Sequence, residues 1–438
     1  MTTRPLLNFS GRASKGRHRA IQRIPYEFGG NSTYLTTYRE RITDGNTIFS
    51  RVFNGEASVA YISSHAVIVD GLDDILLYDG VSFSPSFMTT NTGFNPAEFD
   101  GVTAHHDRLY LWKSKGGVLE FYYGGVGEIN GELTRFPLDR LGNITGTISS
   151  IVSLTIDGRE GVNDVLCIVT TTGEIVLYEG LDPGDATSWS TAGRIKVAPP
   201  VGPKCFTRVG SDCWILTVSG LVSVANSLSN GAMALISELT RPVAEEMRKH
   251  LAEDDRDWQL HTAANGSMAI IHSSKTDTNE CLQFLFNLDS KSWSTADYPV
   301  SRWHNLGFKT GATDFDGRVA HLDFVADGGD TPITMRWVSS WFRMPKRGGI
   351  EYIVPQIVAH GPVTVKALVL TDHNATQADY DEAEQVVTLY PETPADNPQG
   401  RVSINEEIAL DASGSVYQLH LEVTATWAEI LSLTAAVV

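Results

Sequence analysis

The densest group of potential metal ligands in the sequence is His105-His106-Asp107. Two imidazoles and a carboxylate are side chains that zinc accepts as ligands. The tripeptide joins two strand-like runs, however, and neighbouring residues on a strand point to opposite faces of a sheet. We therefore predict that the two imidazoles do not share an ion and that these residues have a structural role.

The four cysteines are Cys167, Cys205, Cys213 and Cys281, and no two of them form a C-x-x-C pair. This spacing predicts neither a zinc site nor a disulfide framework. Cys167 and Cys281 lie in apolar runs, where a free thiol packs as a small hydrophobic group. We expect free thiols, no metal and no bound cofactor, which fits assembly in a reducing cytoplasm.

Patterns typical of enzymes are incomplete. The sequence contains no phosphate-binding loop of the GKS or GKT type, no G-x-S-x-G elbow and no H-E-x-x-H motif. The turns LDPGDATSW (181–189) and LDSKSW (288–293) resemble incomplete Asp-box turns of sialidases, and FRMP (342–345) resembles their arginine-bearing motif. The other arginines and the Tyr/Glu pair of a sialidase cannot be assembled, so we expect no enzyme, and a sialidase-like hydrolase is the weakest alternative.

The elements that position these residues are predicted to be strands. Short runs rich in β-branched and aromatic residues, such as 107–114, 174–180 and 281–287, are bounded by Gly, Asp, Asn or Ser. Three such runs are followed by a turn and then by an aromatic residue, at Phe83, Trp189 and Trp293.

This recurrence has the spacing of a repeat. Trp189 and Trp293 lie 293 − 189 = 104 positions apart, which leaves room for two units of about 52 residues, near the length of a four-stranded propeller blade. The sequence therefore predicts a mainly β protein built on a β-propeller, with Phe83, Trp189 and Trp293 as structural wedges between blades. Candidate blades are 52–98, 101–142, 146–197, 201–236, 258–300 and 303–340.

Three regions are predicted. Residues 1–51 form a basic N-terminal arm with the first strands, 52–344 the β-propeller, and 345–438 a C-terminal β-sandwich-like domain with longer alternating strands. A helix is predicted at 237–251, inserted in the propeller, because acidic residues begin it and basic residues end it.

The charge of the chain is negative and uneven. The net charge of −18 disfavours a protein that grips nucleic acid through phosphates. Residues 1–51 carry nine Lys or Arg against three acids, 9 − 3 = +6, whereas residues 371–438 carry one base against twelve acids, 1 − 12 = −11. This polarity suits contacts between copies or layers, and two solvated faces are the alternative. Assembly-contact candidates are Arg12, Lys15, Arg17, Arg19 and Arg23.

Two further expectations concern the ends and the membrane. We expect that residues 1–24 can be removed without unfolding the propeller, because the basic arm makes its contacts with other subunits. No run in the sequence approaches the roughly 20 apolar residues that a membrane-spanning helix needs, so no membrane span is predicted.

Residues 98–226 carry a resemblance to a known family. Their order is FDGVTAHHDRLYLWKSKGGVLEFYYGG, then a Gly-Glu strand and Y-E-G-L-D-P turn ending at Trp189, then APPVGPKC and GSDCWILTVSGLVSVAN. This order resembles the propeller-bearing tail nozzle, or tail tubular protein B, group of short-tailed bacteriophages (podoviruses).

The resemblance implies a structural protein of the virion tail, assembled in the cytoplasm of the host bacterium. It implies a homo-oligomeric ring of six copies below the portal and a portal-proximal adaptor protein, with tail fibre or tail tip proteins as further partners. Genomic DNA would pass through the ring without tight binding. The position in the tail, nozzle or hub, stays open, and a glycan-binding β-propeller with exposed Trp and Asp side chains is the alternative function.

Overall fold

The computed structural model describes most of the chain. The residues described are 6–10, 22–28, 31–38, 41–51, 53, 57–114, 116–138, 142, 144–158, 161–225, 227, 240–253, 256–275, 278–315, 318–323, 333–339, 341–360, 363–372, 385–389, 402–405, 407–425 and 427–437. They fall into two compact units, one of which is essentially Leu7–Leu322 and the other Asp323–Val438 together with the first six residues.

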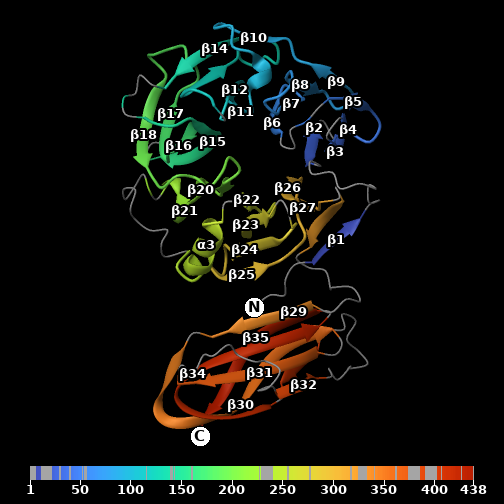
Figure 1. Cartoon of the computed structure of the whole chain (residues 1–438), viewed down its shortest axis with the longest axis vertical. Helices are drawn as coiled ribbons and strands as arrows, with labels where there is room; N and C mark the ends of the chain where they lie inside the picture. Colours follow the sequence, from blue (N-terminus) through green and yellow to red (C-terminus); the bar gives the residue numbers. More distant parts are fainter. Residues whose placement is uncertain are drawn as a thin grey trace. The chain divides into compact units, whose positions relative to one another are not determined.

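The larger unit is a seven-bladed β-propeller, with small sheets arranged around a ring (Figure 1). Short strands separated by tight turns favour this meander because each strand can pair with the next one along the chain. Blade 1 consists of β2 (Gln22–Phe28), β3 (Asn31–Tyr38), β4 (Arg41–Thr43) and β5 (Ile48–Ser50). Blade 2 consists of β6 (Ser58–Ile62), β7 (His65–Val69), β8 (Leu76–Tyr78) and β9 (Phe83–Pro85).

Blade 3 has a fifth strand because β10 pairs in parallel with β14. It contains β10 (Met88–Thr90), β11 (Gly101–His105), β12 (Arg108–Trp112), β13 (Glu120–Tyr123) and β14 (Gly131–Pro137), with a short 3-10 helix η1 (Pro96–Glu98). Blade 4 consists of β15 (Ile148–Gly158), β16 (Gly161–Thr170), β17 (Glu174–Glu179) and β18 (Ser190–Lys196).

The remaining blades complete the ring. Blade 5 contains β19 (Phe206–Val209), β20 (Asp212–Thr217) and β21 (Gly220–Ser223), and the helix α3 (Ala244–Leu251) follows it. Blade 6 contains β22 (Arg256–Thr262), β23 (Met268–Lys275), β24 (Cys281–Asn287) and β25 (Trp293–Ala296). Blade 7 combines β26 (Arg302–Leu306), β27 (Lys309–Thr313) and β28 (Val319–Asp323) with β1 (Leu6–Ser10), which lies beside β28.

The hydrophobic core of the propeller lies between blades. One cluster joins blades 3 and 4 through residues such as Tyr110, Phe121 and Ile168, and others join consecutive pairs around the ring. A middle strand therefore buries both of its faces, which is why β16 contains the continuous apolar run 165–169 and β23 begins with the apolar run 268–271. The packing of each blade depends on both of its neighbours.

The second unit is a β-sandwich. Its strands are β29 (Ile333–Val338), β30 (Phe342–His360), β31 (Val363–Thr371), β32 (Gln385–Leu389), β33 (Val402–Asn405), β34 (Ile408–Ala425) and β35 (Trp427–Val437). The long strands β30 and β34 pair with each other and with partners on both sides, so they join the two layers. Alternate residues Leu419, Leu421 and Val423 are buried in its core.

The predicted class and architecture agree with the structure, but the boundaries differ. The first strands predicted within residues 1–51, outside the propeller, form a complete blade at 22–50, so the propeller has seven blades and not the six candidates. The division of the chain falls at Leu322, not at 344, because β29 pairs with β34 of the sandwich. The helix begins at Ala244, not at 237. Residue 240 is helical but residues 241–243 form a turn, since the residue before Pro242 avoids the helical region; residues 237–239 lie outside the described residues.

The pairing of β1 predicts the effect of an N-terminal truncation. Deleting residues 1–10 removes the outer strand of blade 7 and leaves the edge of β28 unpaired. We expect the melting temperature to fall by roughly 5–10 °C, contrary to the expectation that residues 1–24 are dispensable for folding. Replacing Arg12, Lys15, Arg17 and Arg19 with serine is the matched control and should leave it unchanged. Equal melting temperatures for the truncated and full chains would contradict the closure by β1.

Among the described residues, no helix is both long and apolar enough to cross a membrane.

Candidate functional site

Trp189 lies between blades 3 and 4. It immediately precedes the outer strand β18, is 7% exposed, and its ring stacks on Tyr178 at 5.1 Å between centroids. Tyr110 and Phe136 of blade 3 lie at 6.5 and 6.3 Å. The side chain thus fills the junction with the preceding blade.

Phe83 and Trp293 occupy matching positions in blades 2 and 6, two blades before and two blades after the blade of Trp189. Each begins the outer strand of its blade and is half-buried against the junction with the preceding blade. Phe83 lies 4.6 Å from Tyr78, and Trp293 lies 4.9 Å from Phe286. The three aromatic residues therefore solve the same packing problem in blades 2, 4 and 6, and the 104-residue spacing of the two tryptophans spans two blades.

The Asp-containing turn before Trp189 is closed by its own hydrogen bonds. Asp185 accepts from the backbone and hydroxyl of Thr187, at 2.9 and 2.6 Å, and from the Ser188 hydroxyl at 2.9 Å. These bonds, led by that of the Thr187 hydroxyl, lower the pKa of Asp185. A carboxylate held ionised in this way is suited to fix a turn and not to act as a general acid at neutral pH.

The histidine pair departs from the predicted geometry. His105 ends β11, but His106 and Asp107 lie in the following turn with φ of 47° and 53°, so the alternation of a strand does not apply. The two imidazole centroids are 4.1 Å apart. His105 is 3% exposed and hydrogen-bonds to the Ser153 hydroxyl at 2.8 Å. No metal-binding group of three or more His, Cys, Asp or Glu occurs among the described residues.

Buried histidines predict a pH-dependent stability. Burial lowers the pKa of His272 to about 3 and that of His105 and of His261 to about 4. In the unfolded chain these groups take up protons near pH 6.5, so stability falls as pH drops from 6.5 towards 4, by up to about 1.4 kcal/mol per pH unit per histidine. We expect a lower melting temperature at pH 5 than at pH 7.5, and a shallower dependence in His105→Gln. A constant melting temperature over this range would exclude the effect.

The four cysteines are free thiols. Burial raises the pKa of Cys167 and Cys205, and that of Cys281 to about 11, so none of these thiols is poised as a nucleophile.

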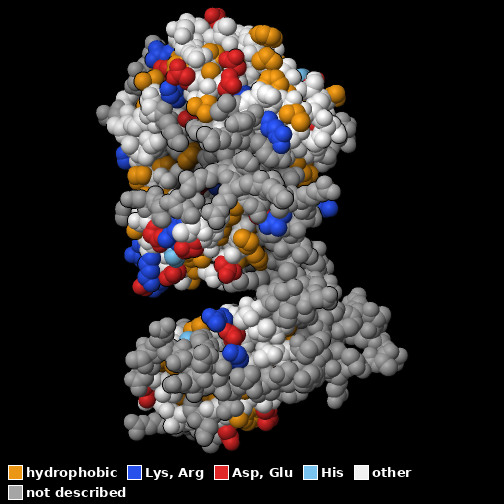
Figure 2. Space-filling model, turned by 45° about the vertical axis from the view of Figure 1, so that its right-hand side comes forward, with side chains coloured by type: hydrophobic (Ala, Val, Ile, Leu, Met, Phe, Trp, Pro, Cys, Tyr) orange, Lys and Arg blue, Asp and Glu red, His pale blue; other side chains and the backbone are white. Residues whose placement is uncertain are grey.

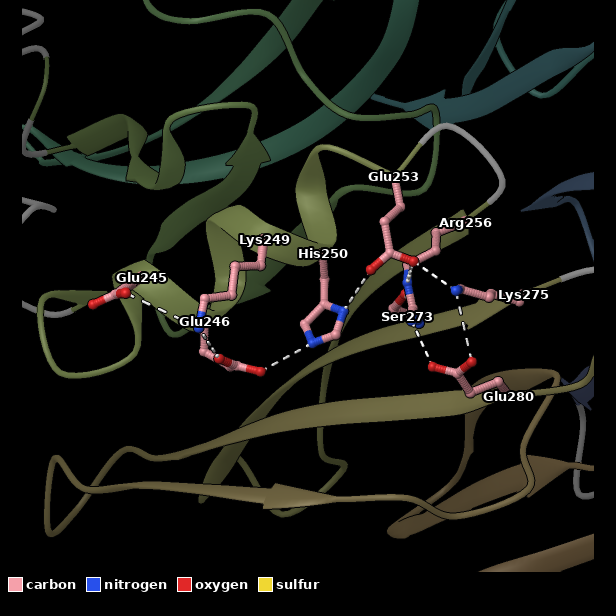
Figure 3. Close-up of polar contacts among 9 residues, drawn as sticks. All are labelled: Glu245, Glu246, Lys249, His250, Glu253, Arg256, Ser273, Lys275 and Glu280. Carbon is pink, nitrogen blue, oxygen red and sulfur yellow. Dashed lines mark hydrogen bonds and ion pairs between the residues drawn. The ribbon is translucent and has the colours of Figure 1, made fainter. Parts of the chain in front are cut away.

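A charged network joins α3 to blade 6 (Figure 3). Arg256, whose side chain is 1% exposed, contacts Glu253 at 3.1 Å, Glu280 at 2.7 Å and the Ser273 hydroxyl at 3.3 Å. Lys275 contacts Glu253 at 2.7 Å. Figure 2 shows charged side chains of both signs gathered at the lower left of the propeller, on the side where Figure 1 labels α3.

The pKa values and contacts of this network indicate a structural role. The Lys275 hydrogen bond above all holds the pKa of Glu253 at about 2, and Arg256 lowers that of Glu280. His250 bridges Glu246 and Glu253 at 3.2 and 3.0 Å. Carboxylates with lowered pKa values are poor general acids at neutral pH, so the network serves to attach α3, whose Met247 is buried against blades 5 and 6.

The predicted assembly-contact residues are only partly described. Arg12, Lys15, Arg17 and Arg19 lie outside the described residues. Arg23 lies in β2, where its backbone is paired with that of Thr36. Arg51, one of the nine bases counted in the arm, is instead buried with Asp70 at 2.6 Å, with side chains 2% and 0% exposed.

The turns that join strands within individual blades form a surface that sequence reasoning missed. We call it the turn face and define it as residues 27–28, 61–64, 79–82, 106–108, 124–128, 181–185 and 307–309. Hydrogen bonds tie these turns together. Across blades, Tyr26 donates to Ser64 O at 2.9 Å and Ser63 donates to Gly127 O at 2.9 Å. Within blade 3, Gly127 N donates to Asp107 O at 2.5 Å.

Further contacts extend the turn face to blades 4 and 7. Arg108 pairs with Asp182 at 3.1 Å. A Cβ at Gly307 would lie 3.3 Å from the Glu27 carboxylate, so the turns of blades 7 and 1 are adjacent. No periodicity marks this surface in the sequence, because it depends on which turns neighbouring blades bring together.

Exposed apolar side chains occur on each of the five blades, 1, 2, 3, 4 and 7, that contribute residues to the turn face. They are Phe308 (96% exposed), Phe28 (44%), Tyr61 (42%), Val81 (72%), Val126 (63%) and Leu181 (64%). The turn face also carries six carboxylates against two bases, a net charge of 2 − 6 = −4. These residues are Glu27, Asp79, Asp107, Glu128, Asp182 and Asp185 against Arg108 and Lys309. This combination is a candidate interaction surface.

Comparisons with known proteins bear on the fold alone. No family model matches the chain, and no curated protein matches its sequence. Among solved structures the chain is similar to YCF48 bound to a D1 peptide, at 13% identity over 74% of this chain and 94% of that one, with a TM-score of 0.38. It is also similar to the WD40 β-propeller domain of Doa1, at 10% identity over 72% of this chain and 94% of that one, with a TM-score of 0.38. A third similar structure is PorZ of the type-IX secretion system of Porphyromonas gingivalis, at 11% identity over 86% of this chain and 56% of that one, with a TM-score of 0.40. Likenesses this distant say nothing about function, and the sheet order of the chain itself establishes the propeller.

Proposed function

We propose that the protein is a non-catalytic structural component of a bacteriophage tail, where copies of it form a ring around the path of the ejected DNA. The observation that carries the proposal is the ordered set of motifs in residues 98–226, which resembles the tail nozzle group. Its residues belong to blades 3, 4 and 5, and those with identified contacts there pack and close turns: Tyr178 stacks on Trp189, and Asp185 fixes the turn between them.

The physical properties of the chain support this role. Clusters between consecutive blades and closure by β1 give a rigid block, which suits a load-bearing tube. A net charge of −18 per copy repels phosphate, so duplex DNA slides past an acidic bore and is not retained. The partners in this proposal are further copies, a portal-proximal adaptor and tail fibre or tip proteins.

The glycan-binding alternative requires exposed tryptophans to stack on sugar rings. Of the eight tryptophans whose burial the structure describes, none is exposed. Trp189 in particular is occupied by its neighbours in the blade junction. These observations favour the structural role.

Binding of duplex DNA tests the proposal. The assembled ring is titrated with labelled duplex DNA and followed by fluorescence anisotropy at low and physiological salt. We expect binding weaker than micromolar at physiological salt, because few contacts neutralise phosphate. Micromolar or tighter binding that persists at physiological salt would contradict a bore that lets DNA slide.

A further inference from the structure

We propose that the turn face binds the basic segment 11–21 of a second copy of this chain. The proposal deepens the ring assembly proposed above and rests on it. It identifies which surface of one copy receives which segment of the next.

The first argument is the chemistry of the turn face. Its exposed apolar side chains, such as Phe308 and Val126, are surrounded by a carboxylate excess of four. A partner must therefore supply several positive charges together with groups that cover apolar surface.

The second argument is the charge of the segment. GRASKGRHRAI, residues 11–21, contains four Lys or Arg and no acid; Ile21 is its one large apolar residue, and Phe9 lies two positions before the segment. The rest of the chain carries a net charge of −18 − 4 = −22. The N-terminal segment is thus the part of this chain that best complements the turn face.

The third argument is the place where the segment joins the fold. It is followed by Gln22, the first residue of β2, whereas the turn face lies at the other end of that strand, at Phe28. Seven residues of strand span roughly 20 Å, so the point at which the segment joins β2 lies a strand length from the turn face of its own copy. A second copy placed head to tail removes this separation, and head-to-tail contacts are those that close rings.

A peptide titration tests the proposal. A fluorescent peptide of residues 8–23 is added to the full chain in which Arg12, Lys15, Arg17 and Arg19 are serine, so that no resident segment competes. We expect saturable binding that is lost when the bases of the peptide are replaced with serine. Two acid-neutralised variants are compared. The turn-face variant carries Glu27→Gln, Asp107→Asn and Glu128→Gln, and the control variant Asp73→Asn, Glu245→Gln and Glu351→Gln.

Both variants lose three exposed carboxylates, but at different places. Binding should weaken about tenfold in the turn-face variant and by less than twofold in the control variant. Phe308→Ser should also weaken it, by about fivefold. Absence of binding, or equal weakening by the two triple variants, would overturn the proposal.

Native mass spectrometry of the unmodified chain provides the second measurement. We expect oligomers that grow with concentration and disappear when the four bases are serine. If the unmodified chain stays monomeric and its turn face does not bind the peptide, the segment covers the turn face of its own copy. That result overturns the contact between copies. Failure of either experiment rejects this contact and leaves the tail assignment standing, whereas absence of the protein from phage tails rejects the assignment and not the contact.

Discussion

Replacing Asp70 with alanine is expected to destabilise the propeller by about 3–5 kcal/mol. The carboxylate accepts from the Arg51 guanidinium at 2.6 Å, and the two side chains are 0% and 2% exposed. The same guanidinium donates to the backbone oxygens of Asp74 and Asp73, at 2.5 and 3.2 Å. Arg51 follows blade 1 and Asp70 follows β7 of blade 2, so the pair fastens two blades together.

The large loss of stability in Asp70→Ala comes from the positive charge of Arg51 that remains buried. Without Asp70 the guanidinium is buried and has no carboxylate to neutralise it. Denaturant unfolding followed by tryptophan fluorescence measures the loss. Asp74→Ala is the matched control, because it removes an exposed carboxylate nearby but keeps the backbone oxygen that accepts from Arg51. It should change the free energy of unfolding by less than about 0.5 kcal/mol.

A double variant separates charge from packing. Arg51→Met with Asp70→Leu removes both charges and keeps apolar volume, so it should be less destabilised than Asp70→Ala alone. A double variant at least as unstable as Asp70→Ala would show that the loss does not arise from the unpaired guanidinium.

Truncation of Trp189 to alanine is expected to cost a comparable amount, about 3–5 kcal/mol. The ring is 7% exposed and contacts Tyr178 of its own blade and Tyr110 and Phe136 of blade 3. Its removal leaves a cavity between two blades that other side chains hold open. The melting temperature and the yield of folded protein should both fall.

The comparison with other aromatic residues makes this prediction specific. Trp293→Ala should cost less, because Trp293 is only half-buried. Phe308→Ala, at a side chain 96% exposed, should leave the free energy of unfolding within about 0.5 kcal/mol. An unchanged melting temperature for Trp189→Ala would contradict the role of these aromatic residues between blades.

Local patterns predicted the propeller because its wedges repeat. Trp189 immediately precedes an outer strand and Trp293 begins one, each after a tight turn, so the same short pattern recurs two blades apart. Blade 1 was missed because residues 22–50 are rich in Thr, Tyr and Arg and lack the apolar runs of β16 or β23. Its inner face is nevertheless apolar, with Ile24, Leu35 and Ile42 buried against blade 2.

Other features depend on contacts that no local pattern reveals. The pairing of β1 with β28 joins residues about 310 positions apart, and nothing in LLNFS indicates its partner. His106 has the backbone conformation of a turn, so its imidazole does not point to the opposite face from that of His105 as it would on a strand. Residues such as Phe308 and Val126 form one surface only because the ring brings their turns together.

Immunogold electron microscopy of phage particles tests the proposed function most directly. An antibody raised against the purified chain is applied to particles produced from the genome that carries this gene. Labelling at the tail below the capsid, with the chain present in purified particles in several copies per tail, is the predicted result. Particles that lack the chain, or that carry it only on the capsid, would contradict the assignment of this propeller to the tail.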